Sequence, residues 1–174
     1  MSAPLIIYHS RGGSTRRYAL LLASATGGTA VPMREVRPGQ MQAADTVVFA
    51  SWLMAGNLQG GGFLRRHWRI LKEKRTVLAV VGLGRTLDEK LWDEYAARAF
   101  TPEMRASLRV FYLRGAYNPA ERNVLIRRLM SGVAGALEKK ASPTPDDLAL
   151  ARDMRQGCDY VSADALSALA SYLG

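Results

Sequence analysis

The residues in this sequence that are best suited to chemistry form one loop near its start, Ser10-Arg11-Gly12-Gly13-Ser14-Thr15. The loop follows a short apolar run and precedes a stretch with helical spacing, so it leads from a buried strand into a helix. The N-terminus of a helix offers unpaired amides and the positive end of the helix dipole, which together favour a bound phosphate. The glycines permit close approach of the backbone, and the hydroxyls add donors. The alternative is an ordinary capped turn without a ligand.

Other candidate residues carry weaker signals. Gly82-Leu83-Gly84 follows an apolar run as a dinucleotide fingerprint would, but Leu87 stands in the place of its third glycine. His9 and His67 have no Cys or His nearby at ligand spacing, so packing or surface roles are favoured over metal binding. Cys158 is the only cysteine, which excludes an internal disulfide. We predict no metal site and no catalytic side chain.

Apolar runs of strand length alternate with stretches of helical spacing along the chain. Strands are predicted over residues 5–8, 31–36, 46–50, 76–81 and 109–113. Helices are predicted from residue 14 or 15 to 25 and over 63–74, 88–100 and 146–156, with a short helix from Pro102 capped by Thr101 and a terminal helix from about residue 163. Residues 51–62 are predicted to be a glycine-rich loop. Strands that are apolar on both faces indicate a parallel sheet covered on both sides, so the sequence predicts a three-layer α/β sandwich with a five-stranded parallel sheet.

Composition sets limits on the class of protein. The 174 residues suit a single domain with a substantial core, which we place over residues 1–174. No apolar run approaches the roughly 20 residues of a membrane span, and no basic region precedes an apolar N-terminal run, so we expect a cytoplasmic protein. Lysine and arginine outnumber the acids 24 to 15, and the net charge of +9 favours an anionic partner: nucleic acid, a membrane surface or an acidic protein. A basic surface without a partner is the alternative.

The first loop and its surroundings resemble the flavodoxin family. The family pattern is a buried strand ending in an aromatic residue, then S/T-x-x-G-[NS]-T and an apolar helix. Those places are held here by Tyr8, Ser10, Gly13, Ser14, Thr15 and Ala19. The likeness extends over nearly the whole chain and is closest to the subgroup that includes menaquinone-linked protoporphyrinogen oxidase, through "VVFASWLMAG", "VLAVVGL" and "FYLRGAYNPAERNVLIRRLMSG". It implies a sheet of flavodoxin-like topology with strand order 2-1-3-4-5.

The resemblance also implies a noncovalent FMN, with its phosphate in the first loop and its ring between two later loops. The residues that the resemblance assigns to the cofactor are Ser10, Arg11, Gly12, Gly13, Ser14, Thr15, Ser51, Trp52, Leu53, Met54, Ala55, Gly56, Asn57, Gly82, Leu83 and Gly84. A backbone carbonyl at Ala55-Gly56 stands where the family reorients one toward the reduced ring. Many relatives have an aromatic residue in the place of Ala55, so Trp52 or Met54 is a candidate to cover the ring here. Packing in the core is the alternative role for Trp52.

The segment 120–140 is the second informative region. Its apolar residues recur at helical spacing: Leu125, Leu129, Met130, Val133, Ala136 and Leu137. Five basic residues accompany them against two acids. An amphipathic basic helix of this kind lies on an anionic membrane surface or docks a partner. The alternative is the last helix covering the sheet, with a polar outer face.

Three functions are open at this point. The first is an FMN-dependent electron-transfer protein, with a redox protein or a quinone as its partner. The second is a quinone-linked, protoporphyrinogen oxidase-like enzyme that is peripheral to the inner face of the membrane. The third is an interaction module of flavodoxin fold that has lost FMN. We expect a monomer or a homodimer and no specific nucleic-acid partner.

Overall fold

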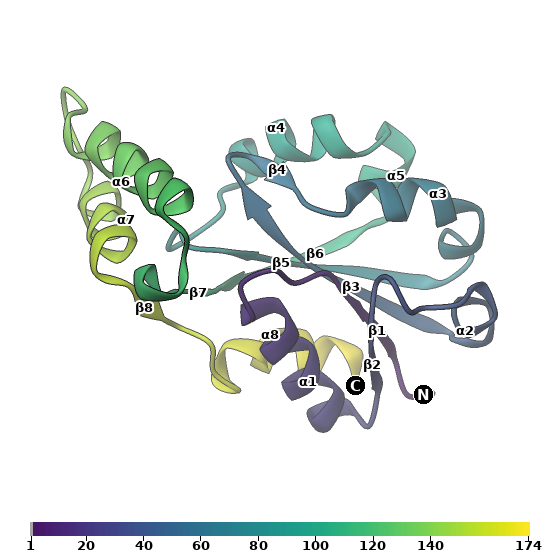
Figure 1. The fold of residues 1–174 in the computed structure, drawn as a ribbon. Coiled ribbons are helices and arrows are strands. Elements are labelled where there is room, and N and C mark those ends of the chain that lie inside the picture. The colour runs from purple at the N-terminus through teal and green to yellow at the C-terminus, as the bar shows by residue number, and fades with distance from the viewer. Residues whose placement is uncertain (1) are drawn as a thin grey trace.

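The computed structural model describes residues 2–174, and Figure 1 shows their arrangement. The elements follow one another as β1 (Leu5–Tyr8), α1 (Ser14–Thr26), β2 (Thr29–Pro32), α2 (Pro38–Ala43), β3 (Thr46–Met54), β4 (Asn57–Leu58), α3 (Gly61–Leu71), β5 (Arg75–Gly82), α4 (Glu89–Ala99), α5 (Pro102–Ser107), β6 (Arg109–Arg114), β7 (Ala116–Tyr117), η1 (Pro119–Glu121), α6 (Val124–Glu138), α7 (Pro145–Gln156), β8 (Cys158–Asp159), η2 (Asp164–Leu166) and α8 (Ser167–Leu173). Five strands form a parallel sheet in the order β2-β1-β3-β5-β6, and β4 pairs antiparallel with β3. Counted among the parallel strands alone, this is the predicted order 2-1-3-4-5, so the predicted fold class is confirmed.

The central strands are buried on both faces because their side chains alternate between two clusters. In β1, Ile6 packs with α1 and α8, whereas Ile7 packs with the helices on the other face. In β5, Val77 packs on the α1 and α8 side, and Leu78 packs on the other face. Strands of this kind need helices on both sides, and Figure 1 shows α1 and α8 on one face of the sheet and α3, α4 and α5 on the other.

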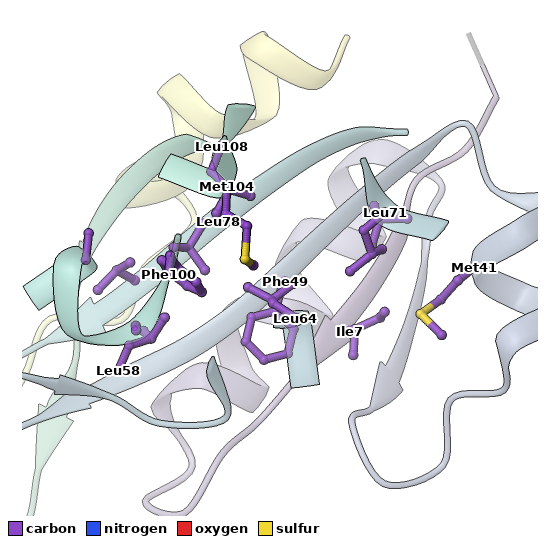
Figure 2. Packing of buried hydrophobic residues seen from close by; sticks show 14 of the residues in the cluster. Ile7, Met41, Phe49, Leu58, Leu64, Leu71, Leu78, Phe100, Met104 and Leu108 are labelled. Carbon is purple, nitrogen blue, oxygen red and sulfur yellow. The ribbon is translucent and has the colours of Figure 1, made fainter. Parts of the chain in front are cut away.

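Figure 2 shows the larger cluster, in which side chains from four helices meet the sheet. Phe49 of β3 lies near its centre, and Leu64 of α3 packs beside it. Met41 of α2 lies at one end of it and Met104 of α5 lies close to Leu78 of β5, and both methionines are fully buried or nearly so. This close packing holds the strands rigidly, so the loops at their ends are presented from a fixed base.

Residue types at the helix ends predicted most of these ends correctly. Thr101 caps α5, since its hydroxyl accepts a hydrogen bond from the amide of Met104 at 3.3 Å. Asp88 caps α4 in the same way, accepting from the amide of Leu91 at 2.8 Å. Both caps satisfy amides that the first turn of a helix leaves unpaired. The helices predicted over 63–74 and 146–156 are found as α3 and α7, with ends shifted by a few residues.

The edge of the sheet at β2 differs from the prediction. The second strand was expected over 31–36 but is β2, which ends at Pro32. The amides of Glu35 and Val36 both donate to the Pro32 carbonyl, at 2.9 and 3.2 Å, so the chain turns there instead of extending. The helix α2 was not predicted: Pro38 begins it instead of ending a strand, as proline does in the first turn of a helix.

The segment after β6 differs more. The helix expected over 120–140 is α6, but it packs chiefly against α7 and does not cover the sheet, so the covering-helix interpretation is wrong. Helices α6 and α7 form a hairpin that Figure 1 shows at one end of the molecule, joined to the rest through the short antiparallel ribbon of β7 and β8. Within residues 2–174, no helix is both long enough and apolar enough to cross a membrane.

Candidate functional site

Three loops meet at one edge of the sheet because the strands before them are parallel. They follow β1, β3 and β5, and ligands bind beyond the carboxyl ends of strands in folds of this kind. Strand β1 lies between β2 and β3. The chain passes from β1 to β2 on one side and from β3 to β5 on the other side. The order of the strands therefore reverses between β1 and β3, which is where a crevice for a ligand forms.

The first loop, residues 10–15, contains an open helix N-terminus. Helix α1 begins at Ser14, and its N-cap residue Gly13 offers no side chain to satisfy the first amides. Gly13 has φ of +95°, a conformation that side chains rarely adopt, so glycine is required there. The amide of Gly13 itself donates to Ser10 Oγ at 3.2 Å, which closes the loop into a compact turn. The free amides at the start of α1 and the helix dipole suit an anion.

The hydroxyls of this loop are not all available to a ligand. Ser14 Oγ accepts a hydrogen bond from the amide of Ala116 at 2.9 Å and donates to the carbonyl of the same residue at 3.3 Å. The Ser14 hydroxyl is thus engaged within the fold, where it anchors β7 to the start of α1. Thr15 is buried behind the loop. The group that Ser14 still offers to an anion is its backbone amide.

Arg122 adds a positive charge to the first loop from a distant part of the chain. Its Nη2 donates to the carbonyl of Gly12 at 3.4 Å. A Cβ on Gly12 would lie 2.7 Å from the same nitrogen, so only glycine admits the guanidinium this close. Arg122 was noticed in the sequence only as one charge of a basic segment. It is 110 residues from Gly12, and no local pattern links the two.

A cleft of about 490 Å³ lies beside the first loop, on the side of the β7–β8 ribbon. Its lining includes Gly12, Ser14, Tyr117, Arg122 and Cys158. Burial and the nearby Asp153 carboxylate raise the pKa of the Cys158 thiol, so it is a poor nucleophile at neutral pH. The lining carries two arginines and two carboxylates, Arg17, Arg122, Glu121 and Asp159, so the positive charge beside the first loop comes from Arg122 itself and not from the cleft as a whole.

The ribbon is held against α1 by further polar contacts. The hydroxyl of Tyr18 donates to the carbonyl of Tyr160 at 3.1 Å and also bonds to the carbonyl of Arg114. Arg17 pairs with Asp159 at 2.7 Å, which holds the Asp159 carboxyl at a lowered pKa. Arg17 is therefore occupied by an internal partner, whereas Arg122 reaches the first loop from a distant part of the chain.

The second wall is a β-hairpin and not the glycine-rich loop predicted over 51–62. Strand β3 continues to Met54 and pairs with β4, so that Met54 lies opposite Asn57. Ser51 is fully buried, and its hydroxyl donates to the carbonyl of Gln59 across the hairpin. Ser51 thus holds the hairpin together and is not exposed to a ligand. The hairpin is the reason for the difference: two strands that pair satisfy backbone groups that a loop would leave to solvent.

The tip of this hairpin is a tight turn at Ala55 and Gly56, with φ of +48° and +72°. Positive φ at both central residues is typical of hairpin turns of type I′. Ala55 is the single residue other than glycine with positive φ in the described chain, so the tip stores strain. Tyr95 of α4 packs directly on Gly56, where an added Cβ would lie 2.6 Å from its ring. The side chain of Asn57 donates to the Ala55 carbonyl at 3.0 Å.

Trp52 belongs to β3, within the hairpin that forms the second wall, and it contacts His9 beside the first loop. Its ring stacks with that of His9 at a centroid distance of 6.4 Å, and it packs partly against the cluster on the α1 side of the sheet. Its indole Nε1 is buried without a hydrogen-bond partner among residues 2–174. Burial, helped by the charge of Arg34, lowers the pKa of His9, so that imidazole is neutral at pH 7. These contacts agree with core packing as the main role of Trp52.

The third wall is the loop that follows β5. Tyr112 supports it from below, because its hydroxyl donates to the Gly84 carbonyl at 2.8 Å and a Cβ on Gly82 would lie 2.6 Å from that oxygen. Burial raises the pKa of Tyr112 to about 12, so the phenol stays protonated. Arg85 in the same loop pairs with Asp146 of α7 at 3.4 Å. The α6–α7 hairpin is thus linked to two walls of the site, through Arg85 and Arg122.

The predicted site residues therefore fall into three groups. The first loop offers open amides, the hairpin at 51–59 offers a strained tip, and the loop after β5 offers a glycine-lined edge. Of the predicted set, Ser14 and Ser51 use their hydroxyls within the fold. The residues that the sequence did not indicate are Arg122, Tyr95 and Tyr112.

Comparison with known proteins gives one family match. The model of the flavodoxin domain matches residues 5–143. No curated protein matches the chain.

Several solved structures are similar at low identity. A flavodoxin, WrbA-like protein from Agrobacterium tumefaciens has 12% identity and a TM-score of 0.49, with 100% of both chains covered. The two-electron reduced flavodoxin of Megasphaera elsdenii has 13% identity and a TM-score of 0.44, covering 87% of this chain and 98% of its own. An azoreductase from Bacillus anthracis has 11% identity and a TM-score of 0.43, covering 66% and 87%.

Proposed function

Because this chain belongs to the flavodoxin domain family, we propose that it binds one noncovalent FMN and transfers electrons between a reduced and an oxidised partner. The observation that carries the proposal is the first loop. It is a glycine-lined helix N-terminus without a side-chain cap, at the carboxyl end of β1, with the Arg122 guanidinium beside it. An anion is the ligand that such an arrangement stabilises.

The described residues fit the phosphate end of FMN. Gly12 and Gly13 leave the backbone of the loop bare, and a side chain at Gly12 would fill the place that the Arg122 guanidinium takes. The amides at the start of α1 and this guanidinium would hold the phosphate oxygens, since both donate hydrogen bonds and carry positive charge. Ser10, with its hydroxyl in the same turn, is the nearest side chain that can add a further donor.

FMN, when bound, supplies the electron-transfer chemistry, and the protein orients it and limits its access to water. The second and third walls are the candidates to hold the flavin ring. Tyr95 and Tyr112 fix these two walls from behind, through Gly56 and Gly84, so that the walls need little rearrangement on binding. The strained turn at Ala55 is the part of the site that can change its backbone at the smallest cost, because strain favours departure from the present conformation.

The test is a titration of the apoprotein with FMN and, in parallel, with riboflavin, which lacks the phosphate. We expect a one-to-one end point with FMN by flavin fluorescence, and weaker binding of riboflavin by at least about ten-fold, the effect of one charge-assisted contact. A colourless protein that does not respond to FMN would refute the proposal in favour of an interaction module. Equal affinity for the two flavins would refute the phosphate site in the first loop.

A second candidate function is favoured by the apolar side chains that α6 exposes, among them Leu125 and Leu129. Quinones are lipid-soluble, so an apolar surface near the site suits an enzyme that oxidises a reduced substrate such as protoporphyrinogen and passes electrons to a quinone. An anaerobic assay with FMN-loaded protein, protoporphyrinogen and menaquinone tests it. Turnover would establish this function, and its absence with FMN bound would leave electron transfer between proteins.

A further inference from the structure

Helix α6 exposes a row of large apolar side chains. Leu125, Leu129 and Val133 are 75%, 47% and 39% exposed. They are spaced by four residues, so they lie along one side of the helix, and we refer to them as the apolar stripe. Val124 at the start of the helix is 57% exposed as well. Exposed apolar side chains that gather on one face mark an interaction surface more often than chance placement does.

The stripe is distinct from the face that holds the hairpin together. Ile126, Met130 and Ala134 are also spaced by four residues, and they are partly or fully buried where α6 meets α7. Each stripe residue precedes one of these by a single position, so the stripe lies on the neighbouring side of the helix. The hairpin already has its internal packing without the stripe. The stripe is therefore available for another surface.

Positive charge borders one side of the stripe. Arg128 and Lys139 lie on that side by helical spacing, and neither has an acidic partner among the ion pairs of residues 2–174. The acid of the same helix, Glu138, is neutralised by Arg155 at 2.7 Å. Arg128 lies three residues from Leu125, so the two side chains are neighbours on the helix surface. An apolar strip edged with cations is complementary to a surface that is apolar inside and anionic outside.

We propose that α6 is a docking surface for an anionic lipid bilayer. The helix lies in the plane of the membrane, with the apolar stripe at the boundary between headgroups and acyl chains and with Arg128 and Lys139 at the lipid phosphates. At 15 residues the helix is about 22 Å long, which suits a helix lying on the surface. Because Arg122 and Arg85 link the hairpin to the candidate site, docking brings that site to the membrane surface.

The test is binding to vesicles, with and without FMN, so that it does not depend on the proposed cofactor. Vesicles of phosphatidylcholine with phosphatidylglycerol are compared with vesicles of phosphatidylcholine alone, by flotation. We expect at least about ten-fold tighter binding to the anionic vesicles, weakened by salt. In Leu129→Trp protein, anionic vesicles are expected to shift the emission of the new tryptophan to the blue.

Matched variants distinguish binding through the stripe from nonspecific hydrophobic binding. Leu125→Glu with Leu129→Glu should lower binding at least about ten-fold. Leu20→Glu is the control, because Leu20 is 45% exposed on α1, far along the chain from the hairpin. All of these side chains are exposed, so the variants should keep the native circular dichroism spectrum.

A second pair of variants tests the charges. Arg128→Glu with Lys139→Glu should lower binding more than Arg66→Glu with Arg69→Glu, which makes the same change in net charge on the exposed face of α3. Failure of the wild type to float, equal losses in the two pairs, or an unshifted tryptophan would overturn the proposal. A dimer in sedimentation that the Leu125/Leu129 variant dissociates would assign the stripe to a second copy of the chain instead.

Discussion

Replacement of Arg122 by alanine should weaken FMN binding by roughly 10- to 100-fold and leave the fold intact. The guanidinium lies 3.4 Å from the Gly12 carbonyl, at the turn where the phosphate is proposed to sit. A hydrogen bond to a charged group contributes about 1.5–3 kcal/mol, and about 1.4 kcal/mol is a factor of ten in affinity. Arg122 is partly exposed, which weakens its field, so the lower end of this range is expected.

Gly12→Ala should also weaken FMN binding, because it displaces the Arg122 guanidinium instead of removing it. The added Cβ would lie 2.7 Å from Arg122 Nη2, so the guanidinium has to move away from the loop. The end of an arginine side chain is flexible, and the protein should therefore remain nearly as stable as the wild type. Because each change removes the same contact, the double variant should bind FMN about as well as either single variant.

The assay is fluorescence titration of FMN at two salt concentrations, with thermal unfolding as the check on folding. Arg127→Ala is the matched control, since it removes one positive charge from the hairpin outside the first loop. Arg122→Lys should bind with intermediate affinity, because it keeps the charge and loses the planar fork of donors. Equal effects of Arg122→Ala and Arg127→Ala, or additive losses in the Gly12/Arg122 double variant, would refute a direct role of Arg122 at the phosphate.

Four further predictions concern stability. Gly13→Ala should lower the free energy of unfolding by about 1–2 kcal/mol, because Gly13 has a left-handed φ of +95°. Gly132→Ala inside α6 should raise the free energy of unfolding by about 0.5–1 kcal/mol. Denaturant unfolding measures both changes. Burial raises the pKa of Tyr112 from 10.0 to about 12, so the stability due to its neutral form is complete below pH 10 and is lost as the pH rises toward 12. Tyr112→Phe lacks the hydrogen bond to the Gly84 carbonyl, so its melting temperature should differ from that of the wild type by a constant amount below pH 10 and by a changing amount only in that window. The hydrogen bonds from Lys140 and from the start of α7 lower the pKa of Asp147 from 3.8 to about 2. The contribution of the Asp147 carboxylate to stability is therefore present above pH 3.8 and lost as the pH falls toward 2. In Asp147→Asn protein, the melting temperature should depend less on pH across that range.

Much of the fold followed from local and periodic features of the sequence. The runs at Leu5–Tyr8 and at residues 77–81 are apolar at every position, which suits a strand covered on both sides. The caps at Asp88 and Thr101 act over three residues and could be identified from residue type alone. The glycine pair of the first loop indicated an anion site because its requirement, a bare backbone before a helix, is also local.

The tertiary structure decided the features that depend on residues far apart in the chain. Ser51 faces the carbonyl of Gln59 only because β3 continues into a hairpin, and the sequence pattern of 51–62 is equally typical of a loop. Arg122 reaches Gly12 across 110 residues because the β7–β8 ribbon brings the two together. The exposed stripe of α6 arose in the same way, since a single amphipathic helix does not specify which of its neighbouring apolar sides α7 covers. Periodicity is a property of one segment, whereas burial and charge at a site are properties of the segments that pack around it.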